Sequence, residues 1–202
     1  MDAAALRSPK SPDRHTTATP TCRRSATEPL LFTTVDSPIG GLLLLGDGRA
    51  LCGLHIQQGC KAVAVEPGWQ RAEEPFGEVR SQLAQYFAGR RMRFDLPLAM
   101  RGTSFQNRVW DELQKIPYGR TTTYGELGCR IGQPSAARAV GLANGSNPIS
   151  VIVPCHRLVG ANGALTGYGG GLERKQMLLS LEADSLAVSH DVPARWGSTW
   201  AF

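Results

Sequence analysis

A cysteine stands directly before a histidine in the run Pro154-Cys155-His156-Arg157. A thiol attacks as its thiolate, and a neighbouring base or cation lowers its pKa enough to form one. The β-branched run Ile149-Ser150-Val151-Ile152-Val153 predicts a buried strand that ends at this cysteine. Since neighbouring residues of a strand point to opposite faces, contact between the two side chains needs a bend after Pro154 or a bridging water. Taken alone, the dipeptide favours a buried structural cysteine beside a surface histidine.

Two short helices are predicted ahead of this run, and they form a candidate helix-turn-helix. The first covers Tyr124 to Ile131, and the second is expected from Pro134 to about Asn144, with Gly145 as its stop. The second helix carries one long cation, Arg138, among small residues that let a backbone lie close to a neighbouring surface: Ala136, Ala137, Ala139, Gly141 and Ala143. A helix laid against DNA and a tightly packed internal helix fit this pattern equally well.

The N-terminal half has the pattern of a small sheet with one helix. Strand-like runs at Leu30 to Val35, Leu42 to Leu45 and Leu51 to Ile56 alternate with turn residues, which predicts an antiparallel meander. A polar loop is expected from Gln57 to Pro75. Apolar residues then recur at helical spacing and predict a helix that is closed by Gly89: Phe76, Val79, Leu83, Tyr86 and Phe87.

These elements divide the chain into four parts. Residues 1–28 contain almost nothing large and apolar, so we expect a disordered tail. Residues 29–100 should form an α/β domain. Residues 101–183 should begin with an amphipathic helix and hold both the helix-turn-helix and the cysteine. Residues 184–202 form a C-terminal extension with two tryptophans, which either pack back onto the domain or decorate a loose tail.

The composition suits a protein with a substantial core and no membrane-spanning segment. Of the 202 residues, 42% are hydrophobic, and the longest apolar run, Leu42 to Leu45, is far too short to cross a bilayer. No apolar stretch follows the N-terminal arginines, so we expect a cytoplasmic protein, associated with the nucleoid if it is bacterial. The net charge of +5 permits a nucleic-acid partner without requiring one.

The five cysteines are dispersed, without a CxxC pair or a repeated spacing. Such an odd, scattered set is typical of reduced thiols and not of a disulfide framework. Cys52, His55 and Cys60 resemble part of a metal-ligand set, but the first two fall in a predicted strand and no fourth ligand is evident. We therefore expect no metal and no cofactor.

The run around Cys155 resembles the active-site signature of the O6-alkylguanine-DNA alkyltransferases. As in that family, it is preceded by Asn147-Pro148 and followed by Gly167-Tyr168-Gly169-Gly170-Gly171. Further segments match in order and at the family's spacing: Phe105-Gln106 with Val109-Trp110, Ile116-Pro117-Tyr118-Gly119, Thr123-Tyr124-Gly125 and Ala136-Ala137-Arg138-Ala139-Val140-Gly141. The resemblance covers residues 103–182 strongly and residues 30–101 weakly.

The resemblance implies a single-turnover DNA-repair methyltransferase that reverses damage directly. Such a protein moves an alkyl group from O6-alkylguanine, and from O4-alkylthymine, in duplex DNA to its own cysteine, here Cys155. The implied fold is α/β: a ribonuclease-H-like antiparallel sheet domain, followed by a helical domain with a winged helix-turn-helix. The implied partner is double-stranded DNA, bound through the minor groove by a monomer, with no membrane and no cofactor involved.

The catalytic roles that the family implies each match a residue of this chain. Cys155 would attack the alkyl carbon, and His156 would take the thiol proton through a bridging water. Glu182 would orient that histidine and complete a relay like that of cysteine hydrolases. Tyr124 would offer its hydroxyl proton to the departing guanine, and Asn147 would brace the turn around the site.

Base flipping and the base pocket are matched as well. The guanine must leave the base stack, and Arg138 corresponds to the arginine that fills the gap. The small residues near it suit close approach to the minor groove: Ala136, Ala137 and Gly141. The pocket would be walled by Val153, Pro154, Tyr168 and Gly169. Gly169 stands where some relatives carry a serine, which leaves backbone donors to bind the guanine oxygen.

Three rival functions are disfavoured by the sequence. A non-enzymatic relative binds alkylated guanine with tryptophan in place of the nucleophile, whereas this chain has Cys155. A methylation-sensing transcription factor needs a metal-bound cysteine cluster, which Cys22 alone in the N-terminal tail cannot form. A cysteine hydrolase needs an oxyanion hole and an acyl substrate, and the sequence points to neither.

Overall fold

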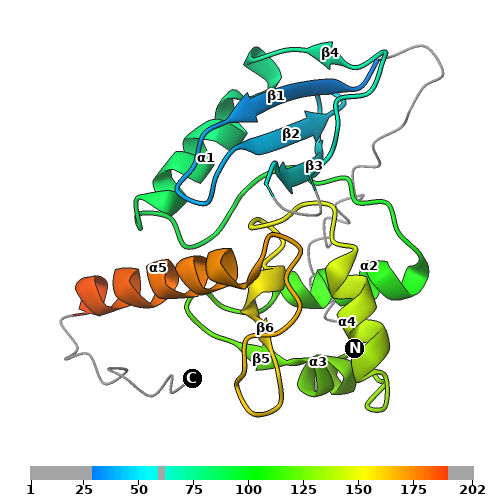
Figure 1. Cartoon of the computed structure of the whole chain (residues 1–202), viewed down its shortest axis with the longest axis vertical. Helices are drawn as coiled ribbons and strands as arrows, with labels where there is room; N and C mark the ends of the chain where they lie inside the picture. The colour runs from blue at the N-terminus through cyan, green and yellow to red at the C-terminus, as the bar shows by residue number, and fades with distance from the viewer. Residues whose placement is uncertain (1–28, 59–61, 191–202) are drawn as a thin grey trace, which may run out of the picture.

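The computed structural model describes residues 29–58 and 62–190. The predicted N-terminal tail and the tryptophans of the extension, Trp196 and Trp200, lie outside these residues. In Figure 1 a sheet with one helix occupies one end of the molecule, and a group of helices occupies the other. The predicted α/β fold, an antiparallel sheet domain followed by a helical domain, is confirmed.

The sheet follows the predicted meander. Strands β1 (Leu31–Val35), β2 (Leu42–Gly46) and β3 (Leu51–Ile56) pair antiparallel in chain order. All of β2 is buried, because it is an inner strand of the sheet with both faces covered. A short strand, β4 (Gln70–Arg71), pairs parallel with β1 inside the predicted loop, since a strand of this length leaves no hydrophobic pattern. The 3₁₀ helix η1 (Glu74–Phe76) leads out of the sheet.

Helix α1 (Gly77–Phe87) packs beside the sheet through its predicted apolar face. Val79, Leu83 and Tyr86 are buried there. The ring of Tyr86 meets that of Tyr118, from the C-terminal half, edge-on at a centroid distance of 5.9 Å. Helix α1 therefore contacts both halves of the chain.

Reciprocal caps start two helices of the C-terminal half. Helix α2 (Ser104–Gln114) is capped by Thr103, whose hydroxyl accepts from the backbone N–H of Gln106 while the Gln106 side chain accepts from the backbone of Thr103. Helix α3 (Tyr124–Arg130) has the same arrangement with Thr123 as its cap. Such caps satisfy N–H groups that no helical carbonyl reaches, and they fix where each helix begins.

The helix-turn-helix consists of α3 and α4 (Ala137–Gly145), which pack against each other and against α2. Helix α4 starts later than the predicted start at Pro134. The intervening residues turn the chain: Gln133 donates its N–H to the carbonyl of Gly128 at 2.8 Å, and Gly132 has a φ of 73°. Pro134 therefore belongs to the turn and not to the first turn of the helix.

The run at 149–153 is a tight, buried turn and not the predicted strand. The N–H of Val153 donates to the carbonyl of Ile149 at 3.0 Å, and Val151 has a left-handed φ of 70°. Burial is as predicted, with Ile149 and Val153 fully enclosed. A buried turn and a buried strand both need apolar residues throughout, so hydrophobicity could not separate them.

The start of this turn is bonded to the sheet. Leu54 of β3 donates its N–H to the carbonyl of Pro148 at 2.9 Å and accepts from the N–H of Ser150 at 3.1 Å. Side chains from both halves join one core, in which Leu54 and Ile149 both lie. The N-terminal half thus supports the segment that leads to Cys155.

The remaining elements surround the predicted site. The 3₁₀ helix η2 (Cys155–Arg157) continues into β6 (Leu158–Val159), which pairs parallel with β5 (Thr122–Thr123). Helix α5 (Leu172–His190) follows a loop at residues 160–171. It runs unbroken across the boundary that the sequence analysis places between residues 183 and 184.

Cys52 of β3 is disulfide-bonded, which contradicts the prediction of reduced thiols throughout. Spacing along the chain does not reveal which thiols the fold brings within the roughly 7 Å between Cα atoms that a disulfide requires. A bonded Cys52 has no thiolate to offer, so it cannot ligate a metal with His55. Within residues 29–58 and 62–190, no group of three or more potential metal-binding side chains occurs.

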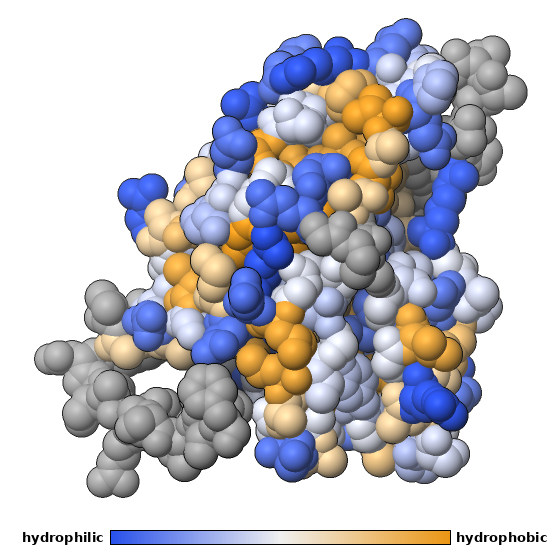
Figure 2. Space-filling model, viewed as in Figure 1, coloured by the Kyte–Doolittle hydropathy of each residue, from blue (hydrophilic) through white to orange (hydrophobic). Residues whose placement is uncertain are grey.

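Hydrophobic surface is divided into separate patches on the face shown in Figure 2. The large apolar side chains with the most exposure are scattered over the described residues: Val65, Met92, Leu142, Leu172 and Met177. In the part of the chain that the structure describes, no helix has both the length and the apolar character needed to span a membrane.

Candidate active site

One asparagine holds the turn before Cys155. The side-chain amide of Asn147 donates to the carbonyl of Val153 at 2.8 Å, and its Oδ1 accepts from the N–H of Ile149 at 3.0 Å. Asn144 of α4 adds a bond of 3.4 Å to the carbonyl of Cys155. Asn147 therefore has the position expected of a residue that braces the turn.

Cys155 and His156 share one turn of 3₁₀ helix that begins directly after Pro154. The chain therefore bends after Pro154, which is one of the two alternatives in the sequence analysis, the other being a bridging water. Cys155 is 4% exposed and His156 is fully buried, so His156 is not the surface histidine that the dipeptide alone favours. Glu182 of α5 completes the predicted group of three, with its Oε1 2.9 Å from Nε2 of His156.

Glu182 is a fully buried carboxylate that accepts several hydrogen bonds. Besides His156, its donors include the hydroxyl of Tyr86 at 2.8 Å and the N–H of Gly119 at 2.9 Å. Arg157 donates from Nε to Oε2 at 3.0 Å and from Nη2 to Oε1 at 2.9 Å. Burial by itself raises the pKa of Glu182, but the hydrogen bonds from His156 and Arg157 and the positive charge of Arg157 outweigh it and lower the pKa to about 2. The carboxylate is therefore ionised at neutral pH.

The ionised Glu182 fixes the tautomer of His156. A carboxylate only accepts, so the proton of their hydrogen bond sits on Nε2 of the histidine. Nδ1 then carries a lone pair, and it has no hydrogen-bond partner among the described residues. Burial lowers the pKa of His156, although Glu182 opposes the shift, and the ring is neutral at neutral pH. The residue next to Cys155 thus has the free ring nitrogen that a general base needs.

Three further residues lie at the site although the sequence analysis gives them no catalytic or binding role: Tyr86, Arg157 and Lys175. Arg157 is nearly buried, with Nη1 bonded to the carbonyl of Ile116 at 2.7 Å and its guanidinium 5.7 Å from the ring centre of Tyr118. Arg157 had a signal in the sequence, because it ends the run that contains the cysteine. Tyr86 had none, since it resembles any other apolar position of its helix.

Lys175 lies fully buried between β6 and the loop at 160–171. Its ammonium donates to the carbonyl of Leu158 and, at 2.7 Å, to that of Thr166. Burial lowers the pKa of Lys175 to about 8, a shift that the charge of nearby Cys155 opposes. The lysine therefore fastens the loop to the strand that follows the 3₁₀ turn.

Tyr168 lies in this loop with a buried hydroxyl that has no hydrogen-bond partner among the described residues. Burial raises its pKa well above the ordinary value, and the charge of nearby Cys155 raises it further. An unpartnered buried hydroxyl is a group that a polar ligand can satisfy. The other predicted pocket residues are buried or half-buried close by in the sequence: Val153, Pro154 and Gly169.

Tyr124 is the first residue of α3 and contacts two parts of the site. Its hydroxyl donates to the carbonyl of Thr166 at 3.2 Å. A Cβ built on Gly141 of α4 would lie 3.8 Å from its ring. The structure thus places Tyr124 between α4 and the loop that Lys175 fastens.

The outer side of α4 carries Arg138. Arg138 and Ala139 are exposed, and Leu142, one turn further, is 72% exposed. The predicted small residues behind them are half-buried: Ala136, Ala137 and Gly141. Helix α4 is therefore a surface helix, and its exposed side presents a cation among small and apolar side chains.

Comparison with known proteins identifies the family. Two family models match, described as the ribonuclease-like domain (residues 30–100) and the DNA binding domain (residues 104–184) of 6-O-methylguanine DNA methyltransferase. A methylated-DNA–protein-cysteine methyltransferase of Methanosarcina acetivorans is 51% identical over 76% of this chain and 98% of its own. The chain belongs to the 6-O-methylguanine DNA methyltransferase family. A relative of the same name from Mycolicibacterium paratuberculosis is 53% identical over 75% of this chain and 91% of its own.

Solved structures of 6-O-methylguanine DNA methyltransferases share the fold. Mycobacterium tuberculosis OGT in complex with DNA is 50% identical, with a TM-score of 0.73 over 77% of this chain and 94% of that chain. The enzyme of Pyrococcus kodakaraensis, 22% identical with a TM-score of 0.51, covers 76% of this chain and 98% of its own and supports the fold alone. The predicted family, and the methyl transfer from DNA to a protein cysteine for which its members are named, are confirmed.

Proposed function

We propose that this chain repairs DNA by moving the alkyl group of O6-alkylguanine in a duplex to Sγ of its own Cys155. The observation that carries the proposal is the buried set of Cys155, His156 and Glu182, in which the residue next to the thiol offers a bare, neutral Nδ1. O4-alkylthymine presents the same alkyl–oxygen bond and is included in the proposal.

The transfer is a displacement at the alkyl carbon. His156 takes the thiol proton on Nδ1 through one water, and Glu182 stabilises the imidazolium that forms. A carbon–sulfur bond forms as the carbon–oxygen bond breaks, and the electron pair of the broken bond leaves with guanine. The thioether has no route back to thiolate in water, so each protein acts once.

Tyr124 and the loop complete the proposed pocket. The exposed hydroxyl of Tyr124 exchanges its bond to the carbonyl of Thr166 for the guanine and donates its proton as negative charge develops there. The proton held by His156 then replaces the one that Tyr124 gives up. Tyr168 encloses the base, together with Val153, Pro154 and Gly169.

We assign duplex binding to α4, which would lie in the minor groove of the DNA. Its exposed Arg138 would fill the gap left by the flipped guanine, whose extrusion costs a few kcal/mol. The half-buried residues Ala136, Ala137 and Gly141 let the helix approach the groove closely. A solved relative in complex with DNA supports DNA as the partner. We propose that the protein acts as a monomer in the cytoplasm, without a cofactor.

Intact mass tests this proposal directly. The protein is incubated with a duplex that carries one O6-methylguanine, and its mass is measured before peptide mapping. The expected result is a single added methyl group on Cys155, with no further addition in excess substrate. An unchanged mass with the lesion still bound would mean a protein that recognises damage without repairing it.

A further inference from the structure

Arg174, in the first turn of α5, bonds to three separate parts of the chain. Its Nε donates to the carbonyl of Ile39 at 2.6 Å, and its Nη1 donates to the carbonyl of Gly170 at 2.9 Å. Its Nη2 donates to the side-chain oxygen of Gln58. Ile39 lies in the turn from β1 to β2, Gln58 follows β3, and Gly170 belongs to the loop at 160–171. One guanidinium therefore connects this loop to two segments of the N-terminal half.

Gly170 is the point at which the loop packs against the sheet. It is buried, and a Cβ built on it would lie 2.6 Å from Cδ1 of Ile56 and 2.9 Å from Cε1 of Tyr168. Its backbone is therefore enclosed between a residue of β3 and the ring that we place against the base. Because the backbone and the ring are in contact, a displacement of Gly170 would also displace Tyr168.

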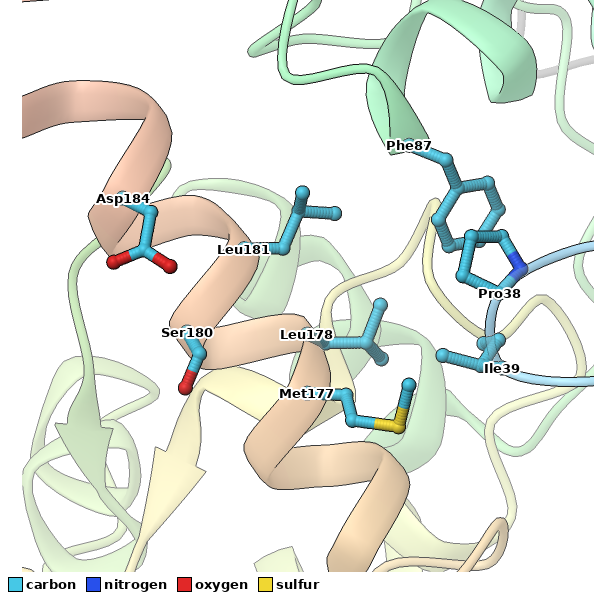
Figure 3. A pocket seen from close by; sticks show the side chains of 8 residues that line it. All are labelled: Pro38, Ile39, Phe87, Met177, Leu178, Ser180, Leu181 and Asp184. Atoms are coloured by element: carbon cyan, nitrogen blue, oxygen red, sulfur yellow. The ribbon is translucent and has the colours of Figure 1, made fainter. Parts of the chain in front are cut away.

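The turn that carries Ile39 is itself packed against α5. Ile39 is 3% exposed and lies in the same core as Leu178. Figure 3 shows Met177 and Leu178 of α5 pointing toward Pro38 and Ile39. The carbonyl that accepts from Arg174 is therefore held in place by a packed turn.

Arg174 and Lys175 hold the loop to different halves of the chain. Successive residues of a helix are rotated by about 100°, so the two side chains leave α5 in different directions. Lys175 binds Leu158 and Thr166, both in the C-terminal half. The positive charge of Arg174 lowers the pKa of Tyr168, against the larger opposing effect of burial. The guanidinium is thus close enough to act on the tyrosine whose hydroxyl faces the proposed pocket.

We propose that Arg174 is a positioning residue for the alkyl transfer: it holds Gly170 and Tyr168 against the N-terminal half and thereby sets the affinity of the pocket for the base. This inference rests on the proposed repair function. The hydrogen bonds of Arg174 go to none of the reacting groups, so its effect falls on binding of the base and not on displacement at the alkyl carbon. Its planar guanidinium suits this role because it can bond to several separated acceptors at once.

Single-turnover kinetics with free O6-benzylguanine test this role. The benzyl mass added to Cys155 is followed over a range of base concentrations, which gives an apparent Kd and a limiting rate. If the loop of Arg174→Met keeps its binding position about a tenth of the time, the apparent Kd rises about 10-fold. The limiting rate should stay within about 2-fold of wild type, because the relay of Cys155, His156 and Glu182 keeps its contacts. A lower limiting rate with an unchanged Kd would indicate a purely structural role and overturn the proposal.

Two further arginine variants separate charge from hydrogen bonding. Arg174→Lys keeps the charge but offers one nitrogen in place of three, so it should recover only part of the affinity. Full recovery would show that charge alone matters, which would overturn the proposal. Arg80→Met removes an exposed arginine that pairs with Glu73, and it should match wild type. Hydrogen exchange at residues 166–171 should be faster in Arg174→Met than in either wild type or Arg80→Met.

A change at Gln58 tests the same connection from the N-terminal half. Gln58→Ala, at an exposed residue, should raise the apparent Kd by less than Arg174→Met does. Adding it to Arg174→Met should cause no further rise, since both changes break the same hydrogen bond. Additive effects would mean that the two residues act separately, against the proposal. A wild-type protein that gains no benzyl group would refute the repair function and this role together, whereas an equal Kd in reactive wild type and Arg174→Met would refute the role alone.

Discussion

The hydroxyl of Tyr86 donates a 2.8 Å hydrogen bond to Oε1 of Glu182, the same oxygen that lies 2.9 Å from His156. Burial, and then the charge of Glu182, raises the pKa of Tyr86 well above its ordinary value, so the hydroxyl keeps its proton and remains a donor. A helix beside the sheet thus helps to position the carboxylate of the proposed relay. This hydrogen bond connects the N-terminal half of the chain to the carboxylate of Glu182.

Replacing Glu182 by Gln should reduce both stability and transfer. Arg157 would lose the carboxylate that neutralises it, and breaking a buried ion pair costs about 3–5 kcal/mol of unfolding free energy. His156 would lose the anion that stabilises its imidazolium, so the single-turnover rate should fall by at least about 10-fold. Urea denaturation and rapid-quench transfer measure the two effects. Glu66→Gln, an exposed carboxylate, is the control and should change neither.

Acid should destabilise the wild-type protein through Glu182. Its pKa is about 2 in the folded protein and 4.5 for the free side chain, so the folded state holds the carboxylate charged while the unfolded state takes up a proton. The resulting stabilisation is present above about pH 4.5 and is lost as pH falls toward 2. Urea denaturation at a series of pH values should show a steeper loss in this window for wild type than for Glu182→Gln. Equal slopes would contradict the low pKa.

Cys155→Ser should abolish alkyl transfer and leave duplex binding nearly unchanged. A serine hydroxyl is far harder to ionise than a thiol, while the two side chains have similar size. Mass spectrometry after incubation with alkylated duplex and a fluorescence binding titration test the two parts. Cys129→Ser, at an exposed thiol, should keep full transfer. Equal loss of transfer and binding in the Cys155 variant would contradict its assigned role.

Arg138→Ala should slow repair of a duplex by about 10- to 100-fold, because the flipped base would leave an unfilled gap. Reaction with free O6-benzylguanine needs no flipping and should be nearly unaffected. The two rates are compared in single-turnover assays. Arg49→Ala removes one positive charge from an exposed turn and serves as the control. A similar fall with both substrates would exclude the flipping role.

Lys175→Met should slow both reactions alike, in contrast to Arg138→Ala. The loop at 160–171 would lose the donor that fastens it through Leu158 and Thr166, and misplacing a binding loop by about 1 Å can cost about 100-fold in rate. The same assays give the rates, and limited proteolysis reports on the loop. Lys115→Met, at a largely exposed lysine, should leave both unchanged. Normal rates in the Lys175 variant would show that the loop is held by its other contacts.

The sequence was most informative where the site is continuous along the chain. Pro154 to Arg157 is one such segment, and its resemblance to a known signature led to Glu182 at a distance. Tyr86 and Lys175 could not be found this way, because neither hydrophobic spacing nor a single lysine indicates which carboxylate or carbonyl it meets after folding. The turn at 149–153 was misassigned for a related reason, since its shape depends on the side-chain bonds of Asn147 and on contact with β3.

The bond between Leu54 and the segment at 148–150 has a consequence for how the molecule melts. The chain that forms the turn before Cys155 is paired with the last strand of the meander, and both lie in one core. Neither half can lose its structure without exposing apolar surface of the other. Calorimetry should therefore record one endothermic peak with equal calorimetric and van't Hoff enthalpies, as for a single cooperative unit. The two matched regions of the sequence are then not two independent thermodynamic domains.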